Sequence, residues 1–178
     1  MKIRSYFSFM LILLLASIAV TAGAEEAEYR LGTGDRVKIT VFGHDDLSGE
    51  FEIDSAGRLS LPLIKLVQAA GLTEEELEEA ITRKLKPDYL VNPKVSVDIL
   101  TYRPFYIIGE VKNPGSYPYT SGMTVVNAVA LGGGYTYRAK KNGITVIRAN
   151  DPERKKIKAD HNTRIYPGDI IEVPERWF

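Results

Sequence analysis

The chain contains 178 residues, no cysteine, and 23 basic side chains balanced by 23 acidic ones. The absence of cysteine excludes disulfides and every form of thiol or metal–thiolate chemistry. Zero net charge gives no overall attraction to nucleic acid or to an anionic membrane, so we expect no nucleic-acid partner. The length suits one globular unit or two small domains that share an interface.

The first 24 residues have the features of a secretory signal peptide. Two basic residues precede an apolar stretch at 7–20, which is shorter than the ~20 residues that a membrane-spanning helix needs. Small residues at 22–24 then predict cleavage between Ala24 and Glu25. An uncleaved N-terminal anchor is the alternative. We expect an exported protein that, without a cysteine, carries no lipid anchor.

Short strands are predicted in the first half of the mature chain. Residues 36–41 alternate apolar and polar side chains, as a strand with one buried face does. Residues 51–53 and 59–61 continue the alternation on either side of a Gly-containing turn, which predicts that the two segments pair as a β-hairpin. Residues 95–99 form a further alternating strand.

One helix stands out between these strands. Thr73 is a favourable N-cap, and Glu76 three residues later completes a capping box. Acidic residues fill the first turn and basic residues the last, as the helix dipole favours. Pro87 ends the helix. The apolar residues at helical spacing, which we expect to be buried, are Leu77, Ala80, Ile81 and Leu85.

A second unit is predicted to begin near Pro104. The Gly132-Gly133-Gly134 run follows a predicted helix and so is interpreted as its C-terminal cap rather than as a phosphate loop, which should open a helix. The predicted elements are a strand at 105–111, a type II turn at 113–116, a helix at 123–131, and strands at 144–148 and 170–173.

Two segments far apart in the sequence resemble each other. Residues 30–35 (RLGTGD) and residues 164–169 (RIYPGD) each place Gly-Asp directly before an alternating strand. Two copies are too few for a repeat architecture. They are interpreted as one type of turn used twice.

Catalytic and metal-binding patterns are weak throughout the chain. His44 lies beside Asp45 and Asp46, but adjacent residues rarely converge on one site, so this segment is interpreted as a solvated turn. His161 is placed in a surface loop. We therefore expect no catalytic residue, no metal site and no cofactor.

Tyrosine is the one residue type with a suggestive distribution. Tyr117 with Tyr119, and Tyr135 with Tyr137, are spaced two residues apart, so each pair can share one face of an extended segment. An aromatic ring with a hydroxyl suits contact with a sugar. The same residues suit a protein interface or a half-buried sheet face. Both interpretations stay open.

Five ordered segments resemble one known family. Residues 29–64 (YRLGTGDRVKITVFGHDDLSGEFEIDSAGRLSLPLI), followed by AGLTEEELEEAI and NPKVSVDI, are similar to the N-terminal domain of bacterial outer-membrane polysaccharide export proteins. Residues 105–136 and the later YPGDIIEVP are similar to the β-grasp domain that follows in that family, usually described as a soluble-ligand-binding module.

The resemblance implies an α+β fold in two small domains. A β-rich export domain with one helix is expected at 25–103, after a signal peptide at 1–24. A β-grasp-like domain is expected at 104–178, and its last strand is allowed to pack back on the first domain.

The resemblance also implies a function in polysaccharide export. Members form homo-oligomeric rings in the periplasm, at the outer membrane of Gram-negative bacteria, and polymer passes through the lumen. They work with an inner-membrane polysaccharide co-polymerase that controls chain length. The expected role is therefore a non-catalytic component of capsule or exopolysaccharide export.

The chain departs from the long members of that family. It has one β-grasp domain, no lipoprotein cysteine, and five residues after Val173, too few to cross a bilayer. We therefore expect a separate outer-membrane partner, such as a β-barrel protein. Trp177 and Phe178 are candidates to dock there or at a membrane surface, and an ordinary packed or frayed terminus is the alternative.

Two other functions are compatible with the sequence. The first is a soluble periplasmic carbohydrate-binding or sensing protein that uses the tyrosines and forms no ring. The second is a glycan hydrolase, which needs two carboxylates on either side of a scissile bond. No pair of acidic residues in the sequence is placed for that chemistry.

Overall fold

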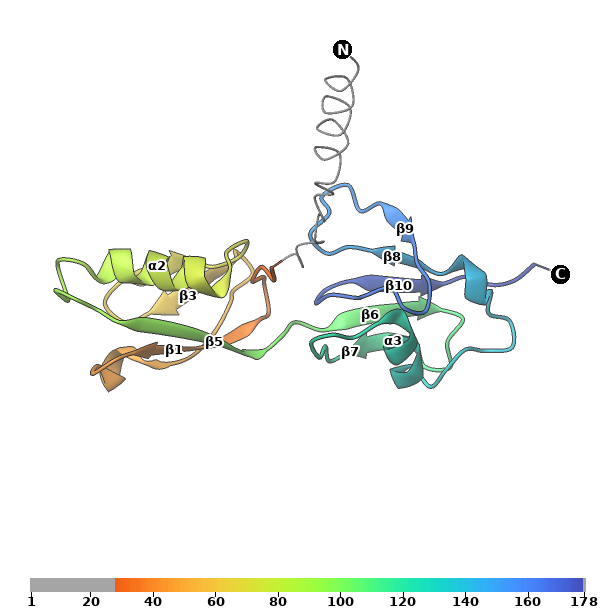
Figure 1. Cartoon of the computed structure of the whole chain (residues 1–178), viewed down its shortest axis with the longest axis horizontal. Coiled ribbons are helices and arrows are strands. Elements are labelled where there is room, and N and C mark those ends of the chain that lie inside the picture. The colour runs from red at the N-terminus through yellow and green to blue at the C-terminus, as the bar shows by residue number, and fades with distance from the viewer. Residues whose placement is uncertain (1–27, 178) are drawn as a thin grey trace, which may run out of the picture.

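The computed structural model describes residues 28–177 and arranges them in two units joined by a short linker, residues 102–104 (Figure 1). The predicted cleavage site, Ala24 and Glu25, lies outside the described residues, as does Phe178. Each unit has its own hydrophobic core. The predicted α+β class is confirmed, because the first unit has one helix with its strands and the second has a five-stranded mixed sheet with a helix.

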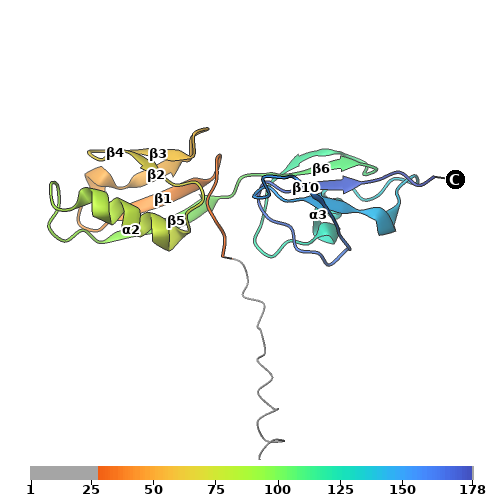
Figure 2. The same cartoon turned by 90° about the horizontal axis from the view of Figure 1, so that it is seen from above.

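The first unit consists of two small sheets and a helix (Figure 2). Antiparallel pairing gives the order β2-β1-β5 in one sheet, while β3 and β4 form a separate two-stranded sheet. The alternation in β1 buries Val37, Ile39 and Val41 against the core, as predicted. The elements are β1 (Arg36–Val41), η2 (Asp45–Leu47), β2 (Gly49–Glu52), β3 (Arg58–Leu61), β4 (Lys65–Gln68), α2 (Glu74–Leu85) and β5 (Val95–Thr101).

The predicted hairpin between residues 51–53 and 59–61 is wrong in its pairing. The chain does turn there, with Gly57 donating its N–H to the Asp54 carbonyl at 2.8 Å. However, Phe51 pairs with Val37 of β1, and β3 pairs with β4. The two segments that flank the turn therefore pair with other strands and not with each other. These pairings place their alternating apolar residues in the core.

The helix α2 follows its local sequence signals closely. Thr73 accepts a hydrogen bond from the Glu76 N–H at 3.1 Å, and the Glu76 carboxylate accepts from the Thr73 N–H at 3.0 Å. This is the predicted capping box. The face formed by Leu77, Ile81 and Leu85 is fully buried, whereas Ala80 is half-buried at its margin. The helix ends at Leu85, two residues before Pro87.

The second unit is a five-stranded mixed sheet in the order β7-β6-β10-β8-β9. Its central pair, β6 and β10, is parallel, and all other pairs are antiparallel. The last strand, β10, lies between β6 and β8 in this sheet. The elements are β6 (Phe105–Gly109), β7 (Gly115–Tyr117), α3 (Val125–Leu131), η3 (Lys141–Gly143), β8 (Thr145–Ile147), β9 (Lys156–Lys158) and β10 (Ile170–Val173).

The helix α3 covers one face of this sheet. Its buried residues Val125, Ala128 and Val129 belong to the same core as Phe105 and Ile107 of β6. The glycine run caps the end of α3, where the Gly132 N–H donates to the Ala128 carbonyl at 3.0 Å. The predicted C-cap is therefore confirmed.

The predicted type II turn at 113–116 is not formed. Gly115, which that turn requires to have a positive φ, is the first residue of β7, and its φ is not positive. It pairs with Ile107 of β6. The ladder with β6 outweighs the local preference of the Pro-Gly pair, so the connection from β6 to β7 is longer than the sequence suggests.

Candidate functional site

The first Gly-Asp turn is built around a buried carboxylate. Asp35 is fully buried, and its Oδ2 accepts hydrogen bonds from the Gly32 N–H at 2.7 Å and from the Tyr29 hydroxyl at 2.6 Å. Gly34 has a φ of +88°, a conformation that favours glycine. Two further bonds come from Arg103, whose N–H reaches Oδ1 at 2.7 Å and whose Nη1 reaches Oδ2 at 3.0 Å. The carboxylate is fully paired despite its burial.

The second Gly-Asp turn has the same construction. Asp169 is 1% exposed, and its Oδ2 accepts from the Tyr166 N–H at 2.9 Å and from Arg148 Nη1 at 2.5 Å. Its Oδ1 accepts from the Ala149 N–H at 3.2 Å, and Gly168 has a φ of +83°. The interpretation that the two sequence segments are one turn used twice is confirmed.

Arg103 of the linker lies between the two turns. Its guanidinium binds Asp35 and lies over the Tyr29 ring, 5.5 Å from the ring centroid. On the other side, a Cβ placed on Gly168 would lie 2.9 Å from Arg103 Nε, so the arginine packs directly against the second turn. The Gly168 N–H also donates to the Pro104 carbonyl at 3.1 Å. These contacts hold the two units to each other at the linker.

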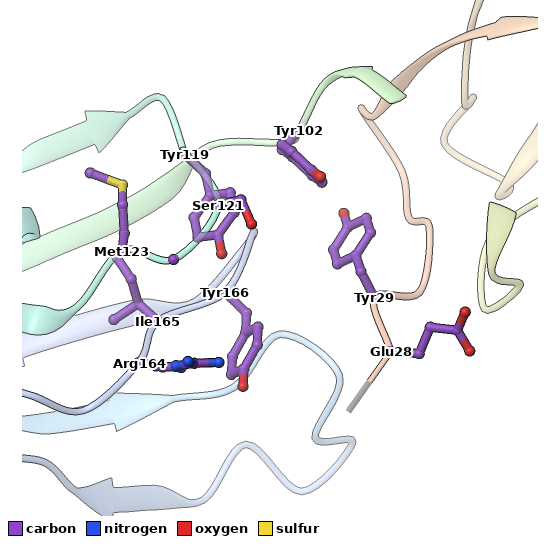
Figure 3. Close-up of a pocket in the computed structure, with 10 residues that line it drawn as sticks. Glu28, Tyr29, Tyr102, Tyr119, Ser121, Met123, Arg164, Ile165 and Tyr166 are labelled. Carbon is purple, nitrogen blue, oxygen red and sulfur yellow. The ribbon is translucent and has the colours of Figure 1, made fainter. Parts of the chain in front are cut away.

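A cleft of about 670 Å³ opens where the two units meet (Figure 3). Four tyrosines from separate segments line it: Tyr29 before the first turn, Tyr102 in the linker, Tyr119 after β7, and Tyr166 in the second turn. The remaining lining residues are Glu28, Ser121, Gly122, Met123, Arg164 and Ile165. We call this space the inter-unit cleft.

Three of these tyrosines form a continuous edge-to-face chain. The ring centroids of Tyr29 and Tyr102 are 5.0 Å apart, and those of Tyr102 and Tyr119 are 5.3 Å apart. Burial raises the pKa of all three hydroxyls, and at Tyr29 the hydrogen bond to Asp35 raises the pKa further. A phenol is protonated at neutral pH, so Tyr102 and Tyr119 can each donate a hydrogen bond, whereas Tyr29 already donates its proton to Asp35.

A second cleft of about 560 Å³ adjoins the first and shares Glu28, Tyr29 and Tyr166 with it. This second cleft is lined by three arginines that are engaged in ion pairs. Arg103 and Arg148 bind the two buried aspartates, and Arg30 binds Glu76 at 2.8 Å. The two clefts together form an open groove beside the linker.

The structure brings one of the four tyrosines singled out in the sequence, Tyr119, into the inter-unit cleft. Tyr117 stacks on Phe105 at a centroid distance of 6.0 Å. Tyr135 is half-buried against His161, and Tyr137 is 79% exposed outside both clefts.

Sequence reasoning missed Tyr29, Tyr102 and Tyr166 as cleft residues. Tyr29 precedes the first repeated segment and Tyr166 lies within the second, so the repeat was a signal for these two, whereas no pattern in the sequence pointed to Tyr102.

The other predicted site residues lie away from the clefts. Trp177 is 94% exposed beyond β10, where the preceding segment is held by an ion pair between Arg138 and Glu175. His44 is the N-cap residue of η2. Among residues 28–177, no group of three histidine, aspartate or glutamate side chains is placed to hold a metal ion.

Fold and clefts together define an α+β protein of two small units with an aromatic groove where they meet. Residues 23–100 match the family model of polysaccharide biosynthesis/export proteins, and residues 104–157 match the SLBB domain. The chain belongs to the polysaccharide biosynthesis/export protein family, with an SLBB domain as its second unit.

Curated relatives agree with this assignment. The chain is 36% identical over 145 residues to the exopolysaccharide production protein ExoF of Rhizobium meliloti, covering 74% of this chain and 34% of that protein. It is 29% identical over 187 residues to the EPS I polysaccharide export outer membrane protein EpsA of Ralstonia solanacearum, covering 86% and 49%. The polysialic acid transport protein KpsD of Escherichia coli is 29% identical over 109 residues, covering 60% and 20%.

The chain thus spans between a fifth and a half of the length of these relatives. Within the part of the chain that the structure describes, neither helix has the length and apolar character needed to cross a membrane.

Proposed function

We propose that this chain is a non-catalytic component of a capsule or exopolysaccharide export machine, which works in the periplasm at the outer membrane. In this proposal identical subunits form a ring and the polymer passes through its lumen. The observation that carries the proposal is the ordered match of an export domain followed by an SLBB domain across residues 23–157. The relatives named for polysaccharide export and transport support it.

The chemistry of the inter-unit cleft favours passage over catalysis. Glycoside hydrolysis needs two carboxyl groups on either side of the scissile bond, about 5–10 Å apart. Glu28 is the only carboxylate among the described residues that line the inter-unit cleft. In the adjoining cleft Asp169 is buried and paired with Arg148. A protein that lets polymer pass has no need of such a pair.

A ring needs two different surfaces on each subunit, because each subunit contacts one neighbour with one surface and the other neighbour with the other. The first candidate is the outer sheet face of the second unit, opposite α3, formed by Tyr106, Ile108, Ile147 and Ile170. Tyr106 pairs with Ile170, and Ile170 pairs with Ile147, so these three form a row across neighbouring strands. Tyr106 and Ile108 are 43% and 45% exposed.

The second candidate is the distal tip of the first unit, formed by Phe42, Leu63, Tyr89 and Val91. These residues belong to the loops after β1, between β3 and β4, and after α2. Phe42 is 78% exposed and Val91 is 90% exposed. Exposed apolar groups gathered at one end of a unit are typical of a contact surface. A contact between the distal tip of one subunit and the outer sheet face of the next would be head-to-tail.

Mixing two variants tests this assembly. Ile108→Glu places a charge on the outer sheet face and Val91→Glu places one on the distal tip, so each variant alone should stay monomeric by light scattering. An equimolar mixture should form a dimer, since one intact surface of each kind remains. Val126→Glu, on the exposed side of α3, is the matched control and should assemble as the wild type does. Full assembly of both single variants would contradict these surfaces.

The partners are part of the same proposal. The ring is proposed to receive polymer from an inner-membrane co-polymerase and to deliver it to a separate outer-membrane protein. Trp177, almost fully exposed beyond β10, is the described side chain best placed to dock on that protein. Ultraviolet crosslinking from a photoreactive amino acid at position 177 would identify the partner.

In-frame deletion of the gene tests the export role. Surface and secreted polysaccharide should fall in the deletion strain and return when the gene is supplied on a plasmid. Unchanged polymer in the deletion strain would overturn the proposal.

One observation favours a second candidate, a soluble periplasmic carbohydrate-binding or sensing protein that forms no ring. The aromatic inter-unit cleft is complete within one chain. Oligomeric state separates the two, because the second candidate remains a monomer at every concentration.

A further inference from the structure

We infer that the inter-unit cleft is a saccharide-binding site that contacts the exported polymer as pyranose rings. This inference rests on the proposed export function and locates, within a single subunit, where polymer and protein touch. Nothing in the family match assigns a ligand to the junction between the two units. The site is formed by the walls Tyr102, Tyr119 and Tyr166 together with Ser121 and Arg164 at its edge.

The shape of the cleft suits a sugar chain. Its volume of about 670 Å³ lies within the range of roughly 300–1,000 Å³ that is typical of small-molecule sites. Figure 3 shows Tyr119 and Tyr166 of the second unit across an open space from Tyr29 of the first. The cleft adjoins the second cleft through Tyr29 and Tyr166, so an extended chain can continue past it instead of ending in a closed pocket.

The chemistry of the lining residues suits a sugar as well. A pyranose ring has an apolar face of C–H groups, which packs on aromatic rings, and a rim of hydroxyls, which need hydrogen-bond partners. The phenol hydroxyls of Tyr102 and Tyr119 are protonated at neutral pH and line the cleft, and Ser121 adds another hydroxyl. Met123 and Ile165 are also among the lining residues; Met123 is partly buried, and Ile165 belongs to the buried core of the second unit beneath them.

The cleft is held in shape independently of any ligand. The edge-to-face contacts join Tyr29, Tyr102 and Tyr119, and the hydrogen bond from Tyr29 to Asp35 fixes the first of these rings. Arg148 lies over the Tyr166 ring, 4.9 Å from its centroid. A preformed aromatic surface binds without a large cost in ordering its side chains. Because the cleft is open and offers few hydrogen bonds, binding should be weak, in the millimolar range, as passage of a polymer requires.

The test uses the purified protein and short oligosaccharides prepared by partial hydrolysis of the polymer that the producing strain secretes. Isoleucine and methionine methyl groups are labelled for NMR. Met123 is the only methionine after residue 10, so its signal reports on the cleft without ambiguity. The methyl groups of Met123 and Ile165 should shift on titration, whereas that of Ile157, exposed on β9, should not.

Two variants change the cleft in different ways. Tyr166→Ala removes one wall and should weaken binding by about fivefold, the loss expected for one aromatic contact. Ser121→Trp fills the cleft from an exposed loop position and should abolish the shifts. It also guards against the possibility that Tyr166→Ala perturbs folding. Tyr137→Ala, which removes an exposed tyrosine outside the cleft, is the matched control and should bind as the wild type does.

The outcomes separate this inference from the proposed function. Unshifted Met123 and Ile165 signals at oligosaccharide concentrations well above the expected millimolar dissociation constant would overturn the cleft site. So would unchanged binding by Ser121→Trp. If the deletion strain loses surface polymer and Ser121→Trp restores it fully, export stands and the cleft site falls. If deletion leaves the polymer unchanged, the export proposal itself fails, whatever the NMR titration gives.

Discussion

The two Gly-Asp turns are alike in structure but differ in where their arginine comes from. In the second unit Asp169 is bound by Arg148, which follows β8 of the same sheet, so that turn braces a single unit from within. In the first unit Asp35 is bound by Arg103 of the linker, 68 residues further along the chain. The buried carboxylate of Asp169 therefore stabilises one unit from within, whereas that of Asp35 binds the linker between the two units.

This difference shows how the Gly-Asp turn, a local motif, can also stabilise the contact between two units. Both arginines are mostly buried, with side-chain exposures of 19% for Arg103 and 22% for Arg148. Only Arg103 also packs against the opposite turn, at Gly168. Substitutions at the two turns should therefore separate stabilisation within one unit from stabilisation of the contact between the units.

The largest effect is expected on replacing either arginine with alanine. Arg103→Ala and Arg148→Ala each leave a buried carboxylate without its guanidinium, which should lower the free energy of unfolding by about 3 kcal/mol. Urea denaturation followed by circular dichroism would measure this loss. Arg138→Ala, at an exposed ion pair with Glu175, is the control and should cost less than about 1 kcal/mol.

Only Arg103→Ala should also loosen the contact between the units. Because the chain has no cysteine, single cysteines at the exposed positions Ser96 and Ser116 can carry spin labels without background. Pulsed electron–electron double resonance measures the distance between the two labels. Its distribution should be broader in Arg103→Ala than in Arg148→Ala. Equal distance distributions in the two variants would mean that Arg103 does not hold the two units in contact.

The turn glycines should differ in their tolerance of alanine. Gly34 and Gly168 both have positive φ, so the backbone strain of alanine alone should cost about 1 kcal/mol at either position. At Gly168 the new Cβ would also lie 2.8 Å from the Ala149 Cβ, while at Gly34 the nearest atom is the Arg103 Cβ at 3.8 Å. We expect Gly168→Ala to cost about 2 kcal/mol more than Gly34→Ala in thermal unfolding. Equal costs would contradict the close packing of Ala149 and of the linker residue Arg103 against the second turn.

The smallest effect concerns pH and the link from the first turn to α2. The Thr73 N–H, and then the Arg30 guanidinium, hold the pKa of Glu76 below its ordinary value of 4.5. A carboxylate with a lowered folded-state pKa stabilises the protein at neutral pH, and this contribution is lost as the pH falls through that pKa. Glu76→Gln should therefore destabilise the protein at pH 7 but not at about pH 3. A constant difference across this range would contradict the assignment.

Local signals in the sequence predicted local structure well. The capping box at Thr73, the glycine cap after α3 and the alternation in β1 depend on neighbours within a few residues, and all three are confirmed. The pairing of β2 with β1 could not be foreseen, since the turn at Gly57 favoured the adjacent segment instead. Which strands pair depends on how the whole core packs. A stretch of a few neighbouring residues does not contain that information.

The assembly of the inter-unit cleft could not be predicted for the same reason, although the repeated turn was a signal for two of its tyrosines. Tyr29, Tyr102 and Tyr166 are separated by more than 60 residues from one to the next, so no spacing rule joins them. What the sequence did contain was the repeated Gly-Asp turn. Both turns pack against the linker, and this packing brings the tyrosines beside the turns into one cleft. The spacing of Tyr117 and Tyr119 drew attention to the right segment but to only one cleft residue.

The central claim is that export depends on an assembly of this chain, and one measurement tests it most directly. Surface polysaccharide is quantified in the deletion strain carrying either the wild-type gene or Ile108→Glu, with the two proteins produced at equal levels. The wild type should restore the polymer, and Ile108→Glu, which should remain folded but monomeric, should not. Full restoration by an Ile108→Glu protein shown to be monomeric would contradict the claim.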